Sequence, residues 1–354
     1  MRLIKGLAKL LGFLLLFAVL AAAGMGGYLT LTEYNPADVE PLEVSASAVN
    51  EPARVGKMLK AVTFNTGYAG LDRSEDFFMD GGVSSRPDNQ RQVENNLSGM
   101  VSALAAQNAQ ICFLQEVDVD SDRSYGTDQA AYYRHGLSMN AAFAYNYRCR
   151  FVPYPWPPIG KVNSGVCTLT KLRVTEASRE SMSVPFSWPL RVANLKRCML
   201  IERVPVQDTD KELVLINFHL DAYDNGEGKA AQTKELMAVI KAEYRNGNYV
   251  IAGGDFNQTF EGVTAIGGHK EGVWQPGAIR NSDLPQGVRL VYDASRPSCR
   301  SLDAPYNGDR ENFVFFILDG FLLTDNIKLN HVETIDLNFQ HSDHNPVAIQ
   351  FTLQ

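Results

Sequence analysis

Several short apolar runs of this chain end in side chains that bind metals or transfer protons. Carboxylate and amide oxygens suit hard cations such as Mg²⁺, and histidine exchanges protons near neutral pH. Held in one site, such groups could hydrolyse a phosphoester, because a cation withdraws charge while carboxylate or imidazole handles protons. The residues at or just beyond the carboxyl ends of these runs are Asn65, Glu116, His219, Asp255, Asn257 and Asp319.

The apolar runs predict the strands that position these side chains. They are nearly continuous and rich in β-branched and aromatic residues, which is typical of strands covered on both faces. Because ligands bind at the rim where the strands of a helix-covered sheet end, we expect the polar residues to converge there. The runs span residues 58–64, 111–114, 213–218, 249–252 and 313–318.

Segments with helical spacing separate these runs, most clearly at 89–106 and 229–244. Their alternation with strands predicts a layered α/β architecture, which we place in one domain over residues 56–354. Two connections rich in Pro, Gly and Asn, 153–160 and 262–287, are expected to be surface loops that shape a substrate cleft.

Two local patterns add chemical detail. Asp255 and Asn257 are two residues apart, so on an extended chain they point the same way and can share a ligand. A turn closed by an Asx hydrogen bond is the alternative interpretation. Asp343 and His344 precede a last predicted strand, 347–353, and suit a site where the carboxylate meets a metal while the imidazole touches phosphate. A turn before the strand is the alternative here.

Six blocks, in this order along the chain, resemble the endonuclease/exonuclease/phosphatase superfamily. The resemblance extends from about Met58 to the C-terminus and implies a deoxyribonuclease-like, four-layer α/β/β/α sandwich. It also implies a Mg²⁺-dependent phosphoric ester hydrolase, with Mn²⁺ or Ca²⁺ as alternative ions. The blocks are Thr63-Phe64-Asn65, Gln115-Glu116, Asn217-Phe218-His219-Leu220, Gly254-Asp255-Phe256-Asn257, Leu318-Asp319 and Ser342-Asp343-His344-Asn345-Pro346.

The resemblance also implies a role for each residue. Glu116 is the expected principal metal ligand, with Asn65 and Asp343 beside the metal. Asp255 would position or deprotonate the attacking water. The remaining expected roles are Asn257 holding a phosphate oxygen, His219 and His344 forming a two-histidine site, and Asp319 orienting His344.

Arg123 is a further candidate for binding the substrate phosphate, although we favour a solvated loop at this position. The other histidines are expected to be surface or packing residues. They are His135, His269, His331 and His341, the last of which is close to the site in sequence.

The N-terminal segment has the pattern of a membrane anchor. Arg2, Lys5 and Lys9 precede an uncharged stretch, 10–32, that is long enough to cross a bilayer core of about 20 residues. A cleaved signal sequence is the alternative, because small residues follow the apolar core. We favour one uncleaved transmembrane helix in the plasma membrane, with the basic end inside and the catalytic domain outside the cytoplasm. A cleaved signal would make the protein secreted.

These expectations divide the chain into an anchor or signal sequence (1–32), a linker (33–55) and a catalytic domain (56–354). Beyond the anchor the chain has 30 basic and 40 acidic residues, which gives a net charge of −10. Nucleic-acid binding relies on Lys and Arg, so this balance disfavours a nuclease. We expect a membrane-anchored extracellular phosphodiesterase or phosphatase, with a membrane lipid as one candidate substrate. An extracellular nuclease and a non-catalytic surface binding module are the alternatives.

Overall fold

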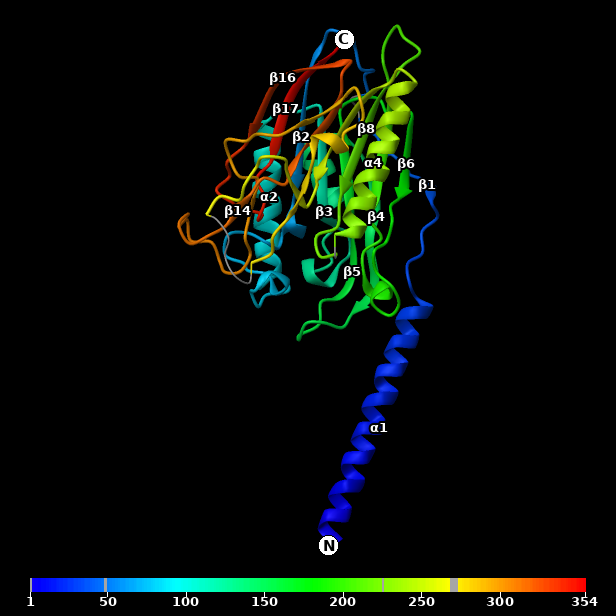
Figure 1. Ribbon diagram of the computed structural model, residues 1–354, viewed down its shortest axis with the longest axis vertical. Coiled ribbons are helices and arrows are strands. Elements are labelled where there is room, and N and C mark those ends of the chain that lie inside the picture. The colour runs from blue at the N-terminus through cyan, green and yellow to red at the C-terminus, as the bar shows by residue number, and fades with distance from the viewer. Residues whose placement is uncertain (1, 48–49, 225, 268–272) are drawn as a thin grey trace.

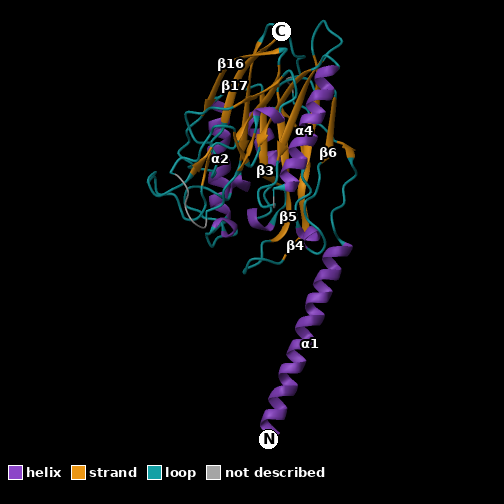
Figure 2. Ribbon diagram, viewed as in Figure 1, coloured by secondary structure: helices purple, strands orange, loops and turns teal. Residues whose placement is uncertain are grey.

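The computed structural model describes residues 2–47, 50–224, 226–267 and 273–354. His269 and part of the expected loop 262–287 therefore lie outside the described residues. Within that part of the chain, two large β-sheets pack face to face and helices cover their outer sides (Figures 1 and 2). The expected four-layer α/β/β/α sandwich is thus confirmed.

The first sheet has six strands in the described chain and carries the earliest and the last predicted strands. β2 and β3 run parallel, and β17 lies antiparallel to β2. The order is β16 (Ile327–Thr334), β17 (Val347–Leu353), β2 (Met58–Asn65), β3 (Ile111–Asp118), β5 (Gly160–Thr170) and β4 (Asn140–Val152).

The second sheet has seven strands in the described chain. β8 and β9 run parallel, and β15 lies antiparallel to β9. The order is β1 (Val39–Pro41), β6 (Glu176–Ser181), β7 (Cys198–Pro205), β8 (Glu212–His219), β9 (Tyr249–Asp255), β15 (Asp319–Thr324) and β12 (Val288–Val291). Two small pairs complete the strands: β10 (Gln258–Phe260) with β11 (Gly277–Ile279), and β13 (Cys299–Arg300) with β14 (Phe315–Phe316).

The core between the sheets explains why the central runs are apolar at nearly every position. One face of each strand packs against the opposite sheet, as where Phe113 on β3 meets Phe321 on β15 with ring centroids 6.3 Å apart. The other face packs under a helix. Val93 and Leu97 of α2 (Gln90–Ala106) cover the first sheet, and Leu236 of α4 (Glu227–Arg245) covers the second.

Both predicted helices are present, and α2 begins where a capping residue allows it. The side chain of Asn89 accepts a hydrogen bond from the backbone N–H of Gln92, which satisfies a donor that the first turn leaves free. A third helix, α3 (Gln129–Leu137), also lies on the first sheet and is capped in the same way by Asp128.

The prediction of a strand over 313–318 was wrong. Only Phe315 and Phe316 of that run form a strand, β14. Ile317 packs in the core beneath α4, and the other apolar residues of the run form two smaller clusters. The central strand β15 instead begins at Asp319, whose register partner is Asp255. Because β15 is antiparallel to β9, its first residue reaches the same edge as the last residue of β9.

The segment 33–55 lies against the domain over its described residues. Its strand β1 pairs with β6 at the edge of the second sheet, and Ser45 bridges to Ala141. Added strands of this kind cover an otherwise open sheet edge. The segment expected to be a linker therefore also extends the sheet.

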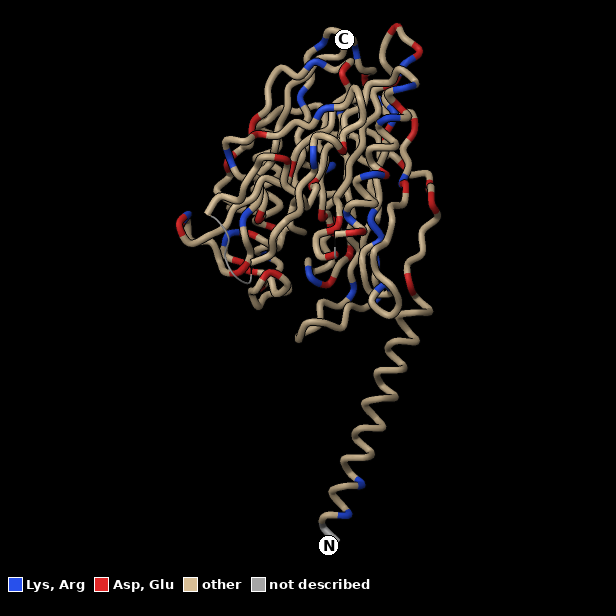
Figure 3. The backbone as a smooth tube through the Cα atoms, in the orientation of Figure 1, with Lys and Arg blue, Asp and Glu red and all other residues tan. Residues whose placement is uncertain are grey.

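One long apolar helix, α1 (Arg2–Leu31), projects from the domain (Figure 1). It is long and apolar enough to span a membrane, and its most apolar window touches nothing else in the described chain. Figure 3 shows charged residues only near its start. Either a signal peptide or an anchor fits these properties.

Candidate active site

The residues singled out in the sequence meet in one cleft of about 500 Å³ at the common edge of the two sheets. Eight of them line the wall of the cleft. Asp319 does not line the wall but lies behind the imidazole of His344, which does. The lining residues are Asn65, Glu116, Arg123, His219, Asp255, Asn257, Asp343 and His344.

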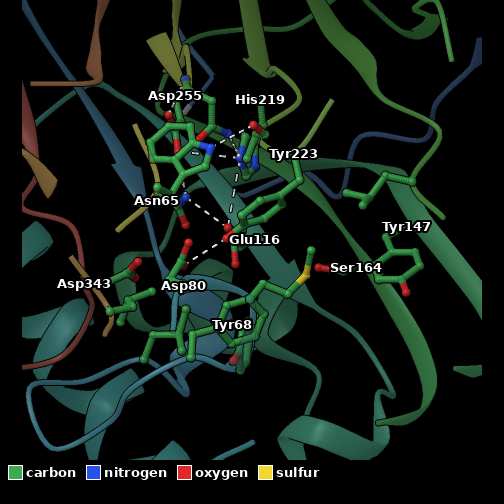
Figure 4. Close-up of a pocket in the computed structure, with 18 of the residues that line it drawn as sticks. Asn65, Tyr68, Asp80, Glu116, Tyr147, Ser164, His219, Tyr223, Asp255 and Asp343 are labelled. Carbon is green, nitrogen blue, oxygen red and sulfur yellow. Dashed lines mark hydrogen bonds and ion pairs between the residues drawn. The ribbon is translucent and has the colours of Figure 1, made fainter. Parts of the chain in front are cut away.

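The two sheets are joined at this edge by Asn65. It ends β2 in the first sheet, and its side-chain N–H donates to Asp255 Oδ2, 2.9 Å away, at the end of β9 in the second. The same amide donates to Glu116 Oε1 at 3.1 Å (Figure 4). Asn65 therefore fixes the relative positions of two catalytic candidates from different sheets.

Glu116 faces the cleft because the strand that carries it is irregular. The pairing of β3 with β5 shifts register between Leu114 and Val117, and Glu116 itself has φ of +53°. Bulges of this kind redirect side chains and occur next to active sites. The Glu116 side chain keeps 27% exposure, whereas its neighbour Gln115 is fully buried.

Glu116 and Asp343 form an acidic pair that fits a divalent cation. Burial raises the pKa of Glu116, and the Asp343 carboxylate raises it further. Burial likewise raises the pKa of Asp343, against the opposing effects of His344 and Arg300. Two carboxylates that repel each other are stabilised by a cation, which makes Glu116 and Asp343 candidate ligands for a divalent cation.

Two other sets of buried residues each bring three potential metal-ligand atoms within 4.8 Å of one another. One consists of Asp255, Asp319 and His344, and it is a candidate metal site on its donor chemistry. The other replaces the two aspartates with Cys299 and Asp343. Burial raises the pKa of the Cys299 thiol to about 12, so its sulfur is a poor ligand for a hard cation.

Both interpretations of the Asp255 and Asn257 pair apply. The backbone N–H of Asn257 donates to Asp255 Oδ1 at 2.8 Å, which is the Asx turn, and Asn257 has φ of +47°. The turn also directs both side chains into the cleft, where Asn257 Nδ2 lies 2.9 Å from Nε2 of His219. The turn therefore places the amide of Asn257 beside the imidazole of His219.

The two histidines of the cleft favour opposite protonation states. Burial lowers the pKa of His219 well below its usual value, with Arg197 and His344 adding to the effect. Burial alone would lower the pKa of His344 too, but Asp319 and the other nearby acidic groups raise it well above the usual value. We therefore assign a neutral His219 and a protonated His344.

Arg123 does not lie in a solvated loop, so that interpretation was wrong. Its guanidinium is buried, forms two 2.9 Å hydrogen bonds with Asp118, and stacks 3.8 Å above the ring of Tyr68. The pair holds the loop after β3 against the cleft wall. Two of the Arg123 nitrogens, Nε and Nη2, are thus already used within the protein.

Asp80 and Tyr223 also line the cleft, and no sequence pattern predicted them. The Tyr223 hydroxyl donates to Asp80 Oδ2 at 2.9 Å (Figure 4). Burial, together with the nearby carboxylates of Asp343 and Glu116, raises the pKa of Asp80 to about 7. Asp80 ends a short 3-10 helix, Phe78–Asp80, and Tyr223 lies in the connection after β8, so neither belongs to an element long enough to show a periodic pattern.

The remaining described histidines lie outside this cleft. His135 and His331 are exposed, and His341 is partly buried with Nδ1 3.4 Å from Oδ1 of Asn96. All five cysteines are free and buried, so no disulfide pairs Cys149 with Cys198.

A sequence profile described as the endonuclease/exonuclease/phosphatase family matches residues 62–344. That match includes every candidate residue of the cleft. The chain belongs to the endonuclease/exonuclease/phosphatase family. Within this family it is a phosphoesterase with a buried candidate metal site. A comparison with curated protein sequences found no match.

Several solved structures share this fold at low sequence identity. An endonuclease/exonuclease/phosphatase from Beutenbergia cavernae DSM 12333 superposes with a TM-score of 0.56 at 15% identity, over 84% of this chain and 72% of its own. D. rerio TDP2, solved with a single-strand DNA product, gives 0.52 at 16%, covering 84% and 99%. A conserved protein of unknown function from Enterococcus faecalis V583 gives 0.52 at 13%, covering 84% and 100%.

Proposed function

We propose that this protein is a membrane-anchored, Mg²⁺-dependent phosphodiesterase or phosphatase whose domain lies outside the cytoplasm and acts on lipid head groups. The observation that carries the proposal is the cleft itself. It joins an acidic cation site to two histidines of opposite protonation preference, and a scaffold for binding alone has no need of that combination.

The cation would be held by Glu116 and Asp343, next to Asn65. When bound, Mg²⁺ withdraws charge from a phosphoryl oxygen, and Mn²⁺ or Ca²⁺ are the alternatives with the same ligand preference. The raised pKa values of the two carboxylates reflect the negative charge that such an ion would neutralise.

The protein's own groups supply the remaining chemistry. Asp255 accepts the proton of the attacking water, and its hydrogen bonds from Asn65 and the Asn257 backbone fix its orientation. Protonated His344, with Nε2 3.7 Å from Asp255 Oδ2, offers positive charge to the phosphoryl oxygens. The side chains of Asn257 and His219 border the same space and hold a phosphate oxygen.

The charge of the cleft favours a lipid head group over a nucleic acid. Among the described residues that line it, the basic ones are Arg123, Arg197 and Arg300, and each already has a partner inside the protein. Arg197 pairs with Asp221 at 3.2 Å, and Arg300 donates to backbone oxygens of Asp72 and Glu75. A long phosphate backbone would find few free cations here.

The apolar part of the cleft points to the same substrate class. A large share of its lining is aliphatic or aromatic, which suits the apolar portion of a lipid next to the phosphate. These residues include Phe77, Phe78, Met79, Ile159, Trp274, Phe316 and Leu318.

The test is Mg²⁺-dependent hydrolysis by the full chain in detergent, comparing bis-p-nitrophenyl phosphate, vesicles of sphingomyelin or phosphatidylinositol, and plasmid DNA. We expect turnover of the first two classes and its loss in His344→Ala. His341→Ala is the matched control, because this histidine is close in sequence but outside the cleft. Preference for DNA would favour the extracellular nuclease, and no activity sensitive to His344→Ala would favour the binding module.

A further inference from the structure

Two aromatic loops without charged residues border the mouth of the cleft. Residues 151–160 read FVPYPWPPIG and residues 181–190 read SMSVPFSWPL, with no Asp, Glu, Lys or Arg in either. Tyr154 and Phe186 from these loops belong to the cleft lining. Both loops therefore contribute to the wall of the cleft, and together we call them the aromatic rim.

The rim exposes large apolar side chains to an unusual degree. Trp156 is 90% exposed, Leu190 69%, Tyr154 68% and Trp188 61%. In each loop two of these side chains are only two residues apart, and exposed apolar groups that cluster on a surface mark a contact site. Trp and Tyr are the residues enriched where a bilayer meets water.

The end of α1 is bound to this same rim. Trp188 Nε1 donates to Thr30 Oγ1 of the last helical turn at 3.1 Å. Leu29 is buried in a cluster with Val152, Ile159 and Val192, which belong to the two loops or their flanks. The loops therefore lie at the level where α1 ends.

An ionic contact fixes this arrangement just beyond the helix. Glu33 lies 2.8 Å from Nε of Arg191 and 2.9 Å from Nζ of Lys196, and both its side chain and that of Lys196 are almost fully buried. Glu33 is the first charged residue after Lys9. The chain thus leaves its apolar helix and immediately forms an ion pair beside the second loop.

The direction of α1 decides which partner the rim meets. Figure 1 shows α1 leaving the domain at the end opposite the C-terminus, and the connection between β4 and β5 points to that same end. If α1 spans a bilayer, Thr30 and Leu31 lie at its outer surface, and Trp188, bonded to Thr30, lies there as well.

We propose that the loops 151–160 and 181–190 sit in the outer surface of the bilayer that α1 crosses, so that the cleft opens onto the head groups of that leaflet. This inference rests on the proposed function and narrows its substrate to phosphoester lipids in the protein's own membrane. The rim contacts the bilayer itself. A lipid therefore reaches the site of Glu116 and Asp343 without leaving the membrane surface.

The position of Trp156 is tested directly by fluorescence. The chain has three tryptophans, so the full-length variant Trp188→Phe, Trp274→Phe leaves Trp156 alone. In phosphatidylcholine vesicles we expect blue-shifted emission, strong quenching by brominated lipid and weak quenching by aqueous iodide. Red-shifted emission with strong iodide quenching and none by brominated lipid would overturn the proposal.

A kinetic comparison tests the consequence for the substrate. Trp156→Ser should lower the rate on vesicle phospholipid about tenfold, equivalent to roughly 1.4 kcal/mol, and leave hydrolysis of soluble bis-p-nitrophenyl phosphate unchanged. Met58→Ser is the matched control. Met58 is 59% exposed and begins β2 beside the end of β17, at the far end of the domain.

The two experiments separate this proposal from the one on which it rests. Absence of all hydrolysis by the wild-type chain would overturn the proposed function, while Trp156 quenching would still show whether the rim sits in the bilayer. Hydrolysis of the soluble diester together with a water-exposed Trp156, or equal vesicle rates for Trp156→Ser and wild type, would overturn the membrane-facing cleft alone.

Discussion

Nδ1 of His344 lies 2.8 Å from Oδ2 of Asp319, and each residue adjoins or begins a strand of a different sheet. His344 precedes β17 of the first sheet, and Asp319 begins β15 of the second. The contact orients the imidazole and stabilises its positive charge. The role proposed for His344 therefore depends on how the two sheets pack together.

Replacing the acidic member of this pair should disable the enzyme without unfolding it. We expect Asp319→Asn to lower kcat for bis-p-nitrophenyl phosphate by about 10²- to 10⁴-fold, the usual contribution of a positioned proton-transfer group. Steady-state kinetics with a thermal melt as the folding control would check this. A fully active Asp319→Asn would remove His344 from the mechanism.

Glu116→Gln should weaken binding of the cation. A ligand that binds only the folded state stabilises it, by about 2.7 kcal/mol at a concentration of 100 Kd. Wild-type protein treated with a chelator should therefore gain in melting temperature when Mg²⁺ is added, and Glu116→Gln should gain much less. Glu176→Gln, on the exposed start of β6, should respond like the wild type. An equal response of Glu116→Gln would exclude Glu116 as a ligand.

Glu202 predicts a pH-dependent stability that is unrelated to catalysis. It is fully buried on β7, and neither carboxylate oxygen has a hydrogen-bond partner in the described chain. Burial raises its pKa to about 8, against about 4.3 for an unfolded glutamate. The folded state thus holds the proton more tightly, so the contribution of Glu202 to stability is most favourable at low pH and falls as pH rises through this range.

Glu202→Gln should remove that dependence. Each unit of pKa difference corresponds to about 1.4 kcal/mol, so the variant should melt several degrees above wild type at pH 8 and close to it at pH 5. Melting curves at the two values provide the measurement, with Glu176→Gln as an exposed control. A constant difference between the two pH values would contradict the assignment.

Arg123 should contribute mainly to stability. Removing one partner of a buried ion pair costs about 3–5 kcal/mol, so Arg123→Met should lower the urea midpoint strongly. The double variant Asp118→Asn, Arg123→Met should recover part of the loss, because it leaves no unpaired charge. Normal stability with a large rise in KM would instead favour the original hypothesis of phosphate binding.

The sequence was most informative where an apolar run is followed by a side chain that can bind a metal or transfer a proton. Asn65, His219 and Asp255 each end a confirmed strand that is apolar at nearly every position. Glu116 follows a similar run and lies at the irregularity within β3. The sequence was misleading just before Asp319. The aromatic run 313–318 resembles a central strand, but most of its residues pack in hydrophobic clusters and do not pair in a sheet. The sequence did not predict Asp80, because the residues around it form no periodic pattern.

By itself, the sequence determined the two-sided burial of the central strands, the apolar helix and the chemistry available at the strand ends. These properties depend on residue type and local spacing. Only the tertiary structure decided which ends meet: the contact of Asn65 with Asp255 spans 190 residues, and the ion pair of Arg123 removes it from a solvated loop. Contacts between distant segments depend on strand pairing and sheet packing, which no local pattern encodes.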